Sequence, residues 1–403
     1  MTPLDSTPPL NVWRALLALA VVFVLLATTG WTAVRDQPGP GEPRDIALAA
    51  WAKDRIRSRA LPDANATPER LARFFASTDM RSAREIADRH PLIVGNLDGA
   101  PVTLRYRANR TALTEALRVE ESRTHDARLS AEGRGEARRR MHRFTSLLQP
   151  GRQILAFDPS GKGRVAEVFG DLERAQRVSV VVPGVDTNLL TFERTNRKYT
   201  APVGMAQSLY EAERTASPTT RTAVIAWADY SAPTGVGLDA STGRLAATGA
   251  DRLVALTRSL PGTARVSLFC HSYGSVVCGV AASELPRRVG DLAVAGSPGM
   301  RAESAARLRT TARVWAMRDS DDWIQDVPYL EVGGLGHGAD PVTPEFGARV
   351  LSATGAVGHA GYFEPGTESL ANFAEIGVGA YGAVSCADGV GACRAGLQAL
   401  NTA

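Results

Sequence analysis

The chain has 403 residues, a length that suits one large α/β domain with a smaller helical part. Hydrophobic residues make up 44% and charged residues 22%, a composition that excludes an intrinsically disordered chain. The net charge of +4 is spread along the sequence, and the densest basic stretch, Arg134–Arg143, has no interleaved aromatic residues to stack on bases. We therefore interpret that stretch as a solvated helix face and expect no nucleic-acid partner.

Near the N-terminus, 20 residues without a charge, Ala15–Val34, lie between two arginines. The most apolar part, Ala15–Ala27, has the length of a signal-peptide core, whereas the full stretch would just span a bilayer. A clean Ala-x-Ala cleavage site is missing, which slightly favours an uncleaved anchor over a removed signal peptide. We expect residues 1–36 to be one or the other, followed by a Pro-rich linker at 37–44. Either way the protein is expected to be extracytoplasmic, membrane-anchored or secreted.

Residues 45–150 are expected to be mostly helical. Thr67-Pro68-Glu69 supplies a capping hydroxyl and a proline for the first turn of a helix. A second helix, Ser82–Arg89, must end before Pro91, because proline disfavours helical geometry in the residue before it. A turn follows at 96–99, and the charged segment Ala108–Leu148 carries apolar residues at helical spacing, which predicts one or two extended helices.

From Gln153 onward the pattern changes to short apolar strands. The runs Gln153–Phe157 and Arg164–Phe169 are joined by a turn-rich segment and predict a hairpin. Later runs are apolar throughout, as in a parallel sheet that is buried on both faces: Val178–Val182, Ala223–Trp227, Val266–Phe269, Leu292–Ala295 and Val314–Met317. The residues between them suffice for crossover helices. We therefore predict an α/β domain at 151–385 with a mostly parallel sheet, and a C-terminal tail at 386–403.

The segment 270–274, Cys-His-Ser-Tyr-Gly, lies between the apolar run that ends at Phe269 and a second run of small residues, Ser275–Ala282. A strand that turns sharply into a helix needs small residues on both sides of the turn, and it lifts the central serine clear of the sheet. The pattern predicts that Ser272 is a nucleophile at such an elbow. The alternative is a buried serine at an ordinary strand–helix junction.

A serine nucleophile needs a base, and in this fold type the chain order is Ser, acid, His. Apart from His271, whose side chain should point away from Ser272, only His337 and His359 follow the serine. We prefer His359, which lies in a glycine-flanked loop just after the expected last strand, Ala348–Ala353. His337 precedes that strand and stays the alternative.

The acid is expected directly after the strand Val314–Met317, where Asp319, Asp321 and Asp322 compete. A carboxylate at this position can hold the imidazole in the required tautomer. We choose Asp322, because Trp323-Ile324 after it can anchor the loop. Asp319 and Asp321 are expected to be solvated or capping groups.

Two backbone N–H groups are expected to stabilise the oxyanion, each typically worth about 3 kcal/mol. One is that of Tyr273, directly after the nucleophile. The other should come from the loop after the early strand Val178–Val182, where Gly184 frees the backbone to aim the N–H of Val185 or Asp186 inward. We select Val185, and a plain strand-end turn is the alternative.

The four cysteines fit an oxidising compartment. Cys386 and Cys393 are spaced to close a short loop. Cys270 and Cys278 are expected to be packed thiols, because six helical residues separate Cys278 from the turn by about 9 Å along the helix axis. No Cys/His spacing suggests a zinc site, so no metal and no organic cofactor are expected.

Several motifs together resemble a family of α/β-hydrolases, mostly from actinobacteria, that has long been catalogued only as a domain of unknown function. In order along the chain, they are His90-Pro91 with Gly95-Asn96-Leu97-Asp98-Gly99, Arg152-Gln153-Ile154-Leu155 with Phe157-Asp158-Pro159, Val182-Pro183-Gly184, His271-Ser272-Tyr273-Gly274-Ser275, Gly296-Ser297-Pro298-Gly299, Asp322-Trp323-Ile324, His337-Gly338 with Asp340-Pro341, and Gly358-His359 with Tyr362-Phe363. The resemblance implies an α/β-hydrolase fold with Ser272, Asp322 and His359 as the triad. This chain departs from the family in having Cys270 where the family usually has glycine.

The function expected from these residues is a serine hydrolase, most simply an esterase or lipase-like enzyme that cleaves an acyl ester, thioester or amide through an acyl-enzyme. Its expected partner is a small-molecule or lipid-like acyl substrate. An acyltransferase with the same triad is one alternative, since an alcohol can intercept the acyl-enzyme in place of water. A non-catalytic hydrolase-fold protein that binds a partner at the cell envelope is the other.

Overall fold

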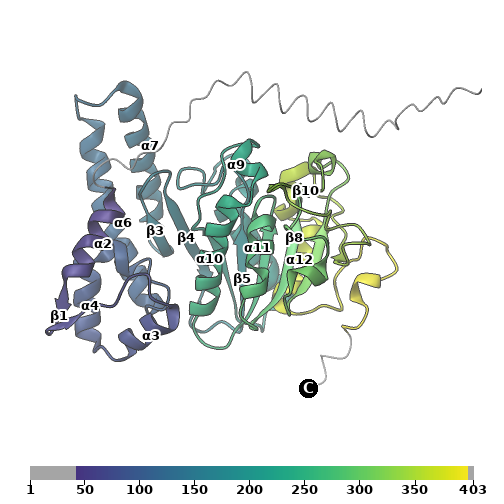
Figure 1. Ribbon diagram of the computed structural model, residues 1–403, viewed down its shortest axis with the longest axis horizontal. Helices are drawn as coiled ribbons and strands as arrows, with labels where there is room; N and C mark the ends of the chain where they lie inside the picture. Colours follow the sequence, from purple (N-terminus) through teal and green to yellow (C-terminus); the bar gives the residue numbers. More distant parts are fainter. Residues whose placement is uncertain (1–41, 398–403) are drawn as a thin grey trace, which may run out of the picture. The chain divides into compact units, whose positions relative to one another are not determined.

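The computed structural model describes residues 42–397, and residues 43–397 belong to one compact unit (Figure 1). The expected signal peptide or anchor at 1–36 lies outside the described residues. In the part of the chain from 42 to 397, no helix is both long enough and apolar enough to cross a membrane.

The centre of the fold is an eight-stranded sheet with the order β12-β9-β8-β7-β5-β6-β4-β3. Its strands are β3 (Gln153–Asp158), β4 (Arg164–Gly170), β5 (Arg177–Val182), β6 (Thr222–Ala228), β7 (Arg265–His271), β8 (Val289–Ala295), β9 (Arg313–Met317) and β12 (Arg349–Val350). The pair β3–β4 is the antiparallel hairpin that the sequence predicts, and β4 also pairs antiparallel with β6. All the other pairs are parallel.

Helices cover both faces of this sheet. Alternate strand residues point to opposite faces, so Val180 and Val182 pack with α10 (Arg244–Ser259) and α11 (Gly274–Ala281), while Val181 packs with α8 (Pro202–Ala216) and α12 (Glu368–Val378). Burial on both faces explains why these strands are apolar throughout. The predicted fold is confirmed: the structure is an α/β-hydrolase fold with a mostly parallel sheet, preceded by N-terminal helices.

The N-terminal helices are α2 (Pro43–Lys53), α3 (Pro68–Ala76), α4 (Met80–Arg89), α5 (Pro91–Val94), α6 (Val102–Thr124) and α7 (Ala131–Leu147). As predicted, the Thr67 side chain caps α3 and α4 ends before Pro91. These helices have a small core of their own that includes Trp51 and Phe74, and α6 also contributes Leu113 to the core on the α8 and α12 face of the sheet. They therefore extend the packed layers beyond β3.

Glu213 of α8 is a buried carboxyl group on the face of the sheet covered by α8 and α12. It accepts a hydrogen bond from the Ser179 hydroxyl, and the helix α12 approaches it so closely that a Cβ added to Gly377 would lie 2.2 Å from its Oε1. Burial raises the pKa of Glu213 to about 8, although the hydrogen bond from Ser179 and the charge of Arg177 act in the opposite direction. Glu213 is therefore protonated in the folded protein at neutral pH.

Because the folded-state pKa of Glu213 lies above its ordinary value of 4.5, its contribution to stability is complete below pH 4.5 and is lost as the pH rises toward 8. We expect Glu213→Gln to remove this dependence, since an amide does not ionise. From pH 5 to pH 8 the free energy of unfolding of the wild type should fall by roughly 3.5 kcal/mol more than that of the variant. Urea titrations at the two pH values measure the difference. Equal losses in both proteins would contradict a proton held by Glu213.

Candidate active site

Ser272 lies at the sharp turn between β7 and α11, and its backbone φ is +55°. A residue other than glycine rarely adopts this left-handed conformation, which is typical of a strained turn that projects a side chain from the end of a sheet. The tight turn requires a glycine at position 274, because a Cβ there would lie 2.2 Å from the Val182 carbonyl oxygen. The strand–turn–helix arrangement predicted around Ser272 is therefore present.

The structure brings Ser272, His359 and Asp322 together from three separate loops. His359 lies in the 3₁₀ helix η5 (Gly358–Phe363), after β12, and its Nε2 is 2.8 Å from Ser272 Oγ. Asp322 caps the 3₁₀ helix η4 (Trp323–Asp326), after β9, and its Oδ1 is 2.8 Å from His359 Nδ1. Ser272 is 6% exposed and Asp322 is fully buried. The distances allow one continuous chain of hydrogen bonds from carboxylate to imidazole to hydroxyl.

Three donors surround the buried Asp322 carboxylate. In addition to His359, the Tyr362 hydroxyl donates to Oδ2 at 2.5 Å and the Ile324 amide donates to Oδ1 at 2.9 Å. Burial by itself would raise the pKa of Asp322, but the hydrogen bonds from His359, Tyr362 and Ile324 outweigh it and leave the pKa below its ordinary value. Asp322 therefore stays ionised and can hold the Nδ1 proton of His359.

Tyr362 and His271 are two contacts of this site that the sequence reasoning did not assign. The Tyr362 hydroxyl also accepts the Asp319 amide at 3.0 Å, so one side chain joins the loop of the acid to the loop of the histidine. The His271 ring lies beside the His359 ring, with 4.9 Å between centroids, and its Nε2 lies 2.6 Å from the His359 carbonyl oxygen. Burial, together with the nearby His359 ring, lowers the pKa of His271 to about 3. The neutral ring donates to that carbonyl and fixes the His359 loop.

Asp319 and Trp323 complete the surroundings of His359. The Gly358 amide donates to Asp319 Oδ2 at 2.8 Å, so Asp319 ties down the histidine loop, in keeping with the capping role expected for it. The half-exposed Trp323 ring lies against the imidazole, with 4.7 Å between the ring centroids. In the sequence, Asp319 and Trp323 stand out only because they lie close to Asp322. That position does not reveal their contact with the His359 loop, about 40 residues later in the chain.

The loop after β5 passes directly over the serine. A Cβ added to Gly184 would lie 2.6 Å from Ser272 Cβ and 2.9 Å from its Oγ. The Asp186 amide is occupied, since it donates to the Pro233 carbonyl at 2.8 Å. Within residues 42–397, the amides of Val185 and Tyr273 have no hydrogen-bond acceptor. Of the two candidates in this loop, Val185 is thus the one with a free donor.

His337, the alternative base, lies elsewhere. Its Nε2 is 2.7 Å from the Ala240 carbonyl oxygen, and its ring packs edge-on against Tyr273 at 5.8 Å between centroids. It hydrogen-bonds neither Ser272 nor Asp322. The geometry thus favours His359 over His337 for contact with the serine.

The prediction of packed thiols at Cys270 and Cys278 is wrong, because the structure joins them in a disulfide with 6.5 Å between the Cα atoms. The separation of the two cysteines cannot be estimated from the distance along the helix axis. After the turn at Ser272, α11 runs back alongside β7, so a residue one turn into the helix lies beside the end of the strand. Cys386 and Cys393 also form a disulfide, which closes the short loop that their spacing allowed.

The strand expected at Ala348–Ala353 is shorter in the structure, where it spans Arg349–Val350.

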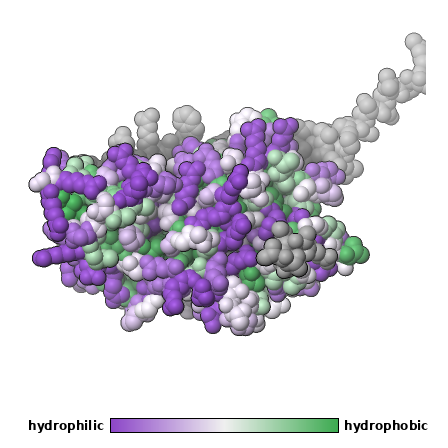
Figure 2. All heavy atoms as spheres, turned by 90° about the horizontal axis from the view of Figure 1, so that it is seen from below, coloured by the Kyte–Doolittle hydropathy of each residue, from purple (hydrophilic) through white to green (hydrophobic). Residues whose placement is uncertain are grey.

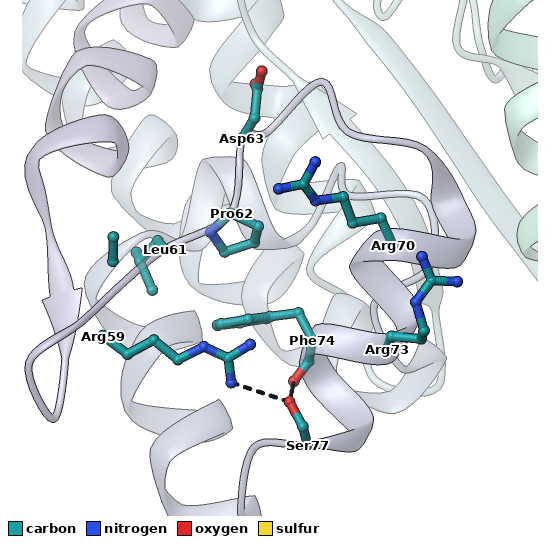
Figure 3. Close-up of a pocket in the computed structure, with 9 residues that line it drawn as sticks. Arg59, Leu61, Pro62, Asp63, Arg70, Arg73, Phe74 and Ser77 are labelled. Atoms are coloured by element: carbon teal, nitrogen blue, oxygen red, sulfur yellow. Dashed lines mark hydrogen bonds between the residues drawn. The ribbon is translucent and has the colours of Figure 1, made fainter.

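One pocket lies apart from the triad. This pocket of about 760 Å³ is found beside α3, where Arg59, Arg70 and Arg73 surround Phe74 and Ser77 (Figure 3). The Arg59 guanidinium donates to the Ser77 hydroxyl and lies over the Phe74 ring there.

Between residues 42 and 397, no group of three or more His, Cys, Asp and Glu side chains is arranged to hold a metal ion.

Comparison with known proteins adds the following similarities. Residues 158–332 match a protein family described as Alpha/beta hydrolase. Uncharacterized proteins from two strains of Mycobacterium tuberculosis are 26% identical over 395 residues, covering 82% of this chain and 58% of their own length. The chain thus spans less than two thirds of these curated relatives.

Solved structures with similar chains include the dienelactone hydrolase of Anabaena variabilis, with 16% identity and a TM-score of 0.35, which covers 54% of this chain and 90% of that one. Another is a 2,6-dihydroxy-pseudo-oxynicotine hydrolase, with 12% identity and a TM-score of 0.36, which covers 83% of this chain and 93% of that one.

Proposed function

Residues 158–332 of this chain match an α/β-hydrolase family, and from this premise we propose that the protein is a serine hydrolase that cleaves carboxylic esters through an acyl-enzyme. The observation that carries the proposal is the hydrogen-bonded series Ser272–His359–Asp322, with 2.8 Å at each step. A structural serine would not require an ionised carboxylate and an imidazole aligned behind a strained turn. Thioesters and amides would react by the same steps.

In the proposed reaction, Ser272 Oγ attacks the ester carbonyl carbon while its proton passes to His359 Nε2. The carbonyl oxygen becomes an oxyanion, which accepts hydrogen bonds from the Val185 and Tyr273 amides. When the tetrahedral intermediate collapses, the bond to the alcohol breaks and His359 returns the proton to the leaving oxygen. A water molecule then attacks the acyl-enzyme in the same way, releasing the acid and regenerating the Ser272 hydroxyl.

Asp322 acts through His359. Its carboxylate accepts the Nδ1 proton, which leaves Nε2 free as the base that faces Ser272, and its negative charge stabilises the imidazolium that forms in each half-reaction. The hydroxyl of Tyr362 and the ring of His271 act as positioning groups, since they hold the two loops on which Asp322 and His359 lie. No step in this scheme calls for a metal or an organic cofactor.

We also propose an extracytoplasmic location. The support consists of the two disulfides and the uncharged stretch Ala15–Val34, since disulfides persist in oxidising compartments and such a stretch directs export or anchoring. The mass of the mature protein would distinguish a removed signal peptide from an anchor that is kept.

Labelling with a fluorophosphonate probe tests the proposed function. The probe reacts covalently with an activated serine, so we expect the full-length wild type to be labelled and Ser272→Ala to be unlabelled. Ser275→Ala is the matched control, because the Ser275 hydroxyl donates to the Cys270 carbonyl at 3.1 Å and has no base beside it. Labelling that persists undiminished in Ser272→Ala would discredit the assignment.

A further inference from the structure

Large hydrophobic side chains that remain exposed are concentrated around the proposed active site. Of the eleven in the described part of the chain, seven follow the carboxyl ends of β6, β9 and β12: Val236, Leu238, Trp323, Leu330, Val332, Leu335 and Val357. We call these seven residues the apolar collar. Scattered single exposures need no explanation, whereas a gathering of this kind at one edge of a sheet marks an interaction surface.

The loops of the collar meet at one edge of the molecule. Parallel strands place their carboxyl ends together, so these loops lie at the edge where β7 presents Ser272; the short helix α9 (Leu238–Ser241) and the hairpin of β10 (Glu331–Val332) and β11 (Leu335–Gly336) are seen along the upper edge of the sheet in Figure 1. A bridge between Thr242 and Leu335 joins the loop after β6 to the loop after β9. Since β5, β7 and β8 lie between those two strands, this contact spans the end of the sheet that carries the serine.

The collar is continuous with the catalytic groups. Trp323 packs on the His359 ring, and Val357, which is 80% exposed, lies two residues before His359. On the other side, the Gly235 amide donates to Asp186 Oδ1 at 2.8 Å, which ties the segment leading to Val236 to the loop of the proposed oxyanion donor. An apolar group that touches the collar at Trp323 is therefore next to the His359 ring.

The collar side chains project outward. They are 47–80% exposed, whereas the side chains of a groove for a single acyl chain would be largely covered. Outward apolar side chains suit insertion into the surface of a lipid aggregate. The face seen from below, away from α9 and β10, is by contrast dominated by hydrophilic side chains (Figure 2).

The charges beside the collar indicate which kind of lipid surface it suits. The segments 236–242 and 319–338 contain no Lys or Arg, and apart from the buried Asp322 they contain five carboxylates: Asp239, Asp319, Asp321, Asp326 and Glu331. Two of them form ion pairs with flanking arginines, Asp239 with Arg244 and Glu331 with Arg301. Of the other cations beside the collar, Arg318 is paired with Asp340, and Lys162 donates to the Thr234 hydroxyl. The local charge stays negative, which disfavours a surface of anionic headgroups.

We propose that the apolar collar docks on a neutral or zwitterionic lipid surface and that the substrate is an acyl ester drawn from that surface. This inference rests on the proposed function, since it names the substrate class of the same site. In the docked state the collar side chains enter the acyl layer, the exposed carboxylates stay at the headgroup level, and the ester carbonyl reaches Ser272 without crossing water.

The test compares two esters. We define the interfacial ratio as the rate of hydrolysis of p-nitrophenyl palmitate in phosphatidylcholine vesicles divided by that of p-nitrophenyl acetate in solution. In the full-length protein, the triple variant Leu330→Ser/Val332→Ser/Leu335→Ser should lower this ratio by at least about tenfold. The control is Ile46→Ser/Met80→Ser/Val119→Ser, which removes three equally exposed side chains outside the collar and should leave the ratio unchanged. All these proteins share the same N-terminal segment, so its own affinity for vesicles cancels.

A second arm uses the wild type alone, so it does not depend on how a variant folds. Replacing one third of the phosphatidylcholine with phosphatidylglycerol should lower palmitate hydrolysis severalfold, and adding salt should restore part of it. An unchanged ratio in the collar variant, or faster hydrolysis on the anionic vesicles, would overturn the proposed docking while leaving the hydrolase intact, provided that the acetate is hydrolysed. If neither ester is hydrolysed and the fluorophosphonate does not react, the proposed function fails as well.

Discussion

Replacing His359 with alanine should lower the turnover of p-nitrophenyl butyrate on the order of 10⁶-fold, the size of effect seen when the histidine of a serine-hydrolase triad is removed. The reason is geometric: His359 Nε2 is the only basic group hydrogen-bonded to Ser272 Oγ among the residues that the structure describes. Without it, the hydroxyl has no acceptor for its proton and the leaving alcohol has no donor. Steady-state rates with purified full-length protein measure the effect.

His337→Gln is the comparison for this variant. Glutamine keeps a donor for the Ala240 carbonyl, and the ring it replaces is hydrogen-bonded to neither Ser272 nor Asp322. Turnover should therefore fall far less than in His359→Ala. If His337→Gln abolished turnover while His359→Ala retained it, the base would have been assigned to the wrong loop.

Replacing Asp322 with asparagine should lower the turnover of the same ester by roughly 10⁴-fold, the loss known for this change in a serine protease triad. Asparagine fills the same space but offers an NH₂ group to His359, which favours the tautomer whose Nε2 carries the proton and can no longer act as base. Asp322 is fully buried and accepts three hydrogen bonds, so no other acceptor can replace it.

Asp321→Asn is the matched control, because it makes the same chemical change one residue earlier on an exposed side chain. It should retain turnover close to that of the wild type. Similar losses in both variants would point to an electrostatic effect of the whole acidic loop and would contradict a specific contact between Asp322 and His359.

Much of this site could be predicted from the sequence because its residues follow strands. Apolar runs such as Val178–Val182 and Val314–Met317 identify the strands, and the carboxyl ends of parallel strands meet at one edge. Residues just after those runs, among them Ser272 and Asp322, therefore had to lie close together. The order of the residues along the chain then restricted the histidine to two positions.

The supporting contacts could not be predicted, because they join loops whose conformations the sequence pattern does not specify. Tyr362 binds Asp322 and Asp319 across 40 and 43 residues, and His271 binds the His359 carbonyl across 88. The collar has the same character: its members are spread from Val236 to Val357, and each one by itself is an unremarkable exposed side chain. Only the folded loops show that they lie at one edge of the sheet.

The disulfide between Cys270 and Cys278 was missed for a different reason. A nucleophile elbow reverses the chain direction, so a strand residue and a helix residue on either side of the turn become neighbours even though they are eight positions apart. Cys270 replaces the glycine usual in the resembling family, and the disulfide gives its side chain a partner on α11. A distance counted along one helix axis cannot capture that reversal.

The most direct measurement is to map the fluorophosphonate adduct in the full-length wild type. After reduction and tryptic digestion, the peptide 266–287 should carry the added mass, and fragmentation should assign it to Ser272 and to none of the other serines of that peptide. An adduct on a different serine, or a protein that stays unmodified under conditions that label a known esterase, would contradict activation of the Ser272 hydroxyl by His359.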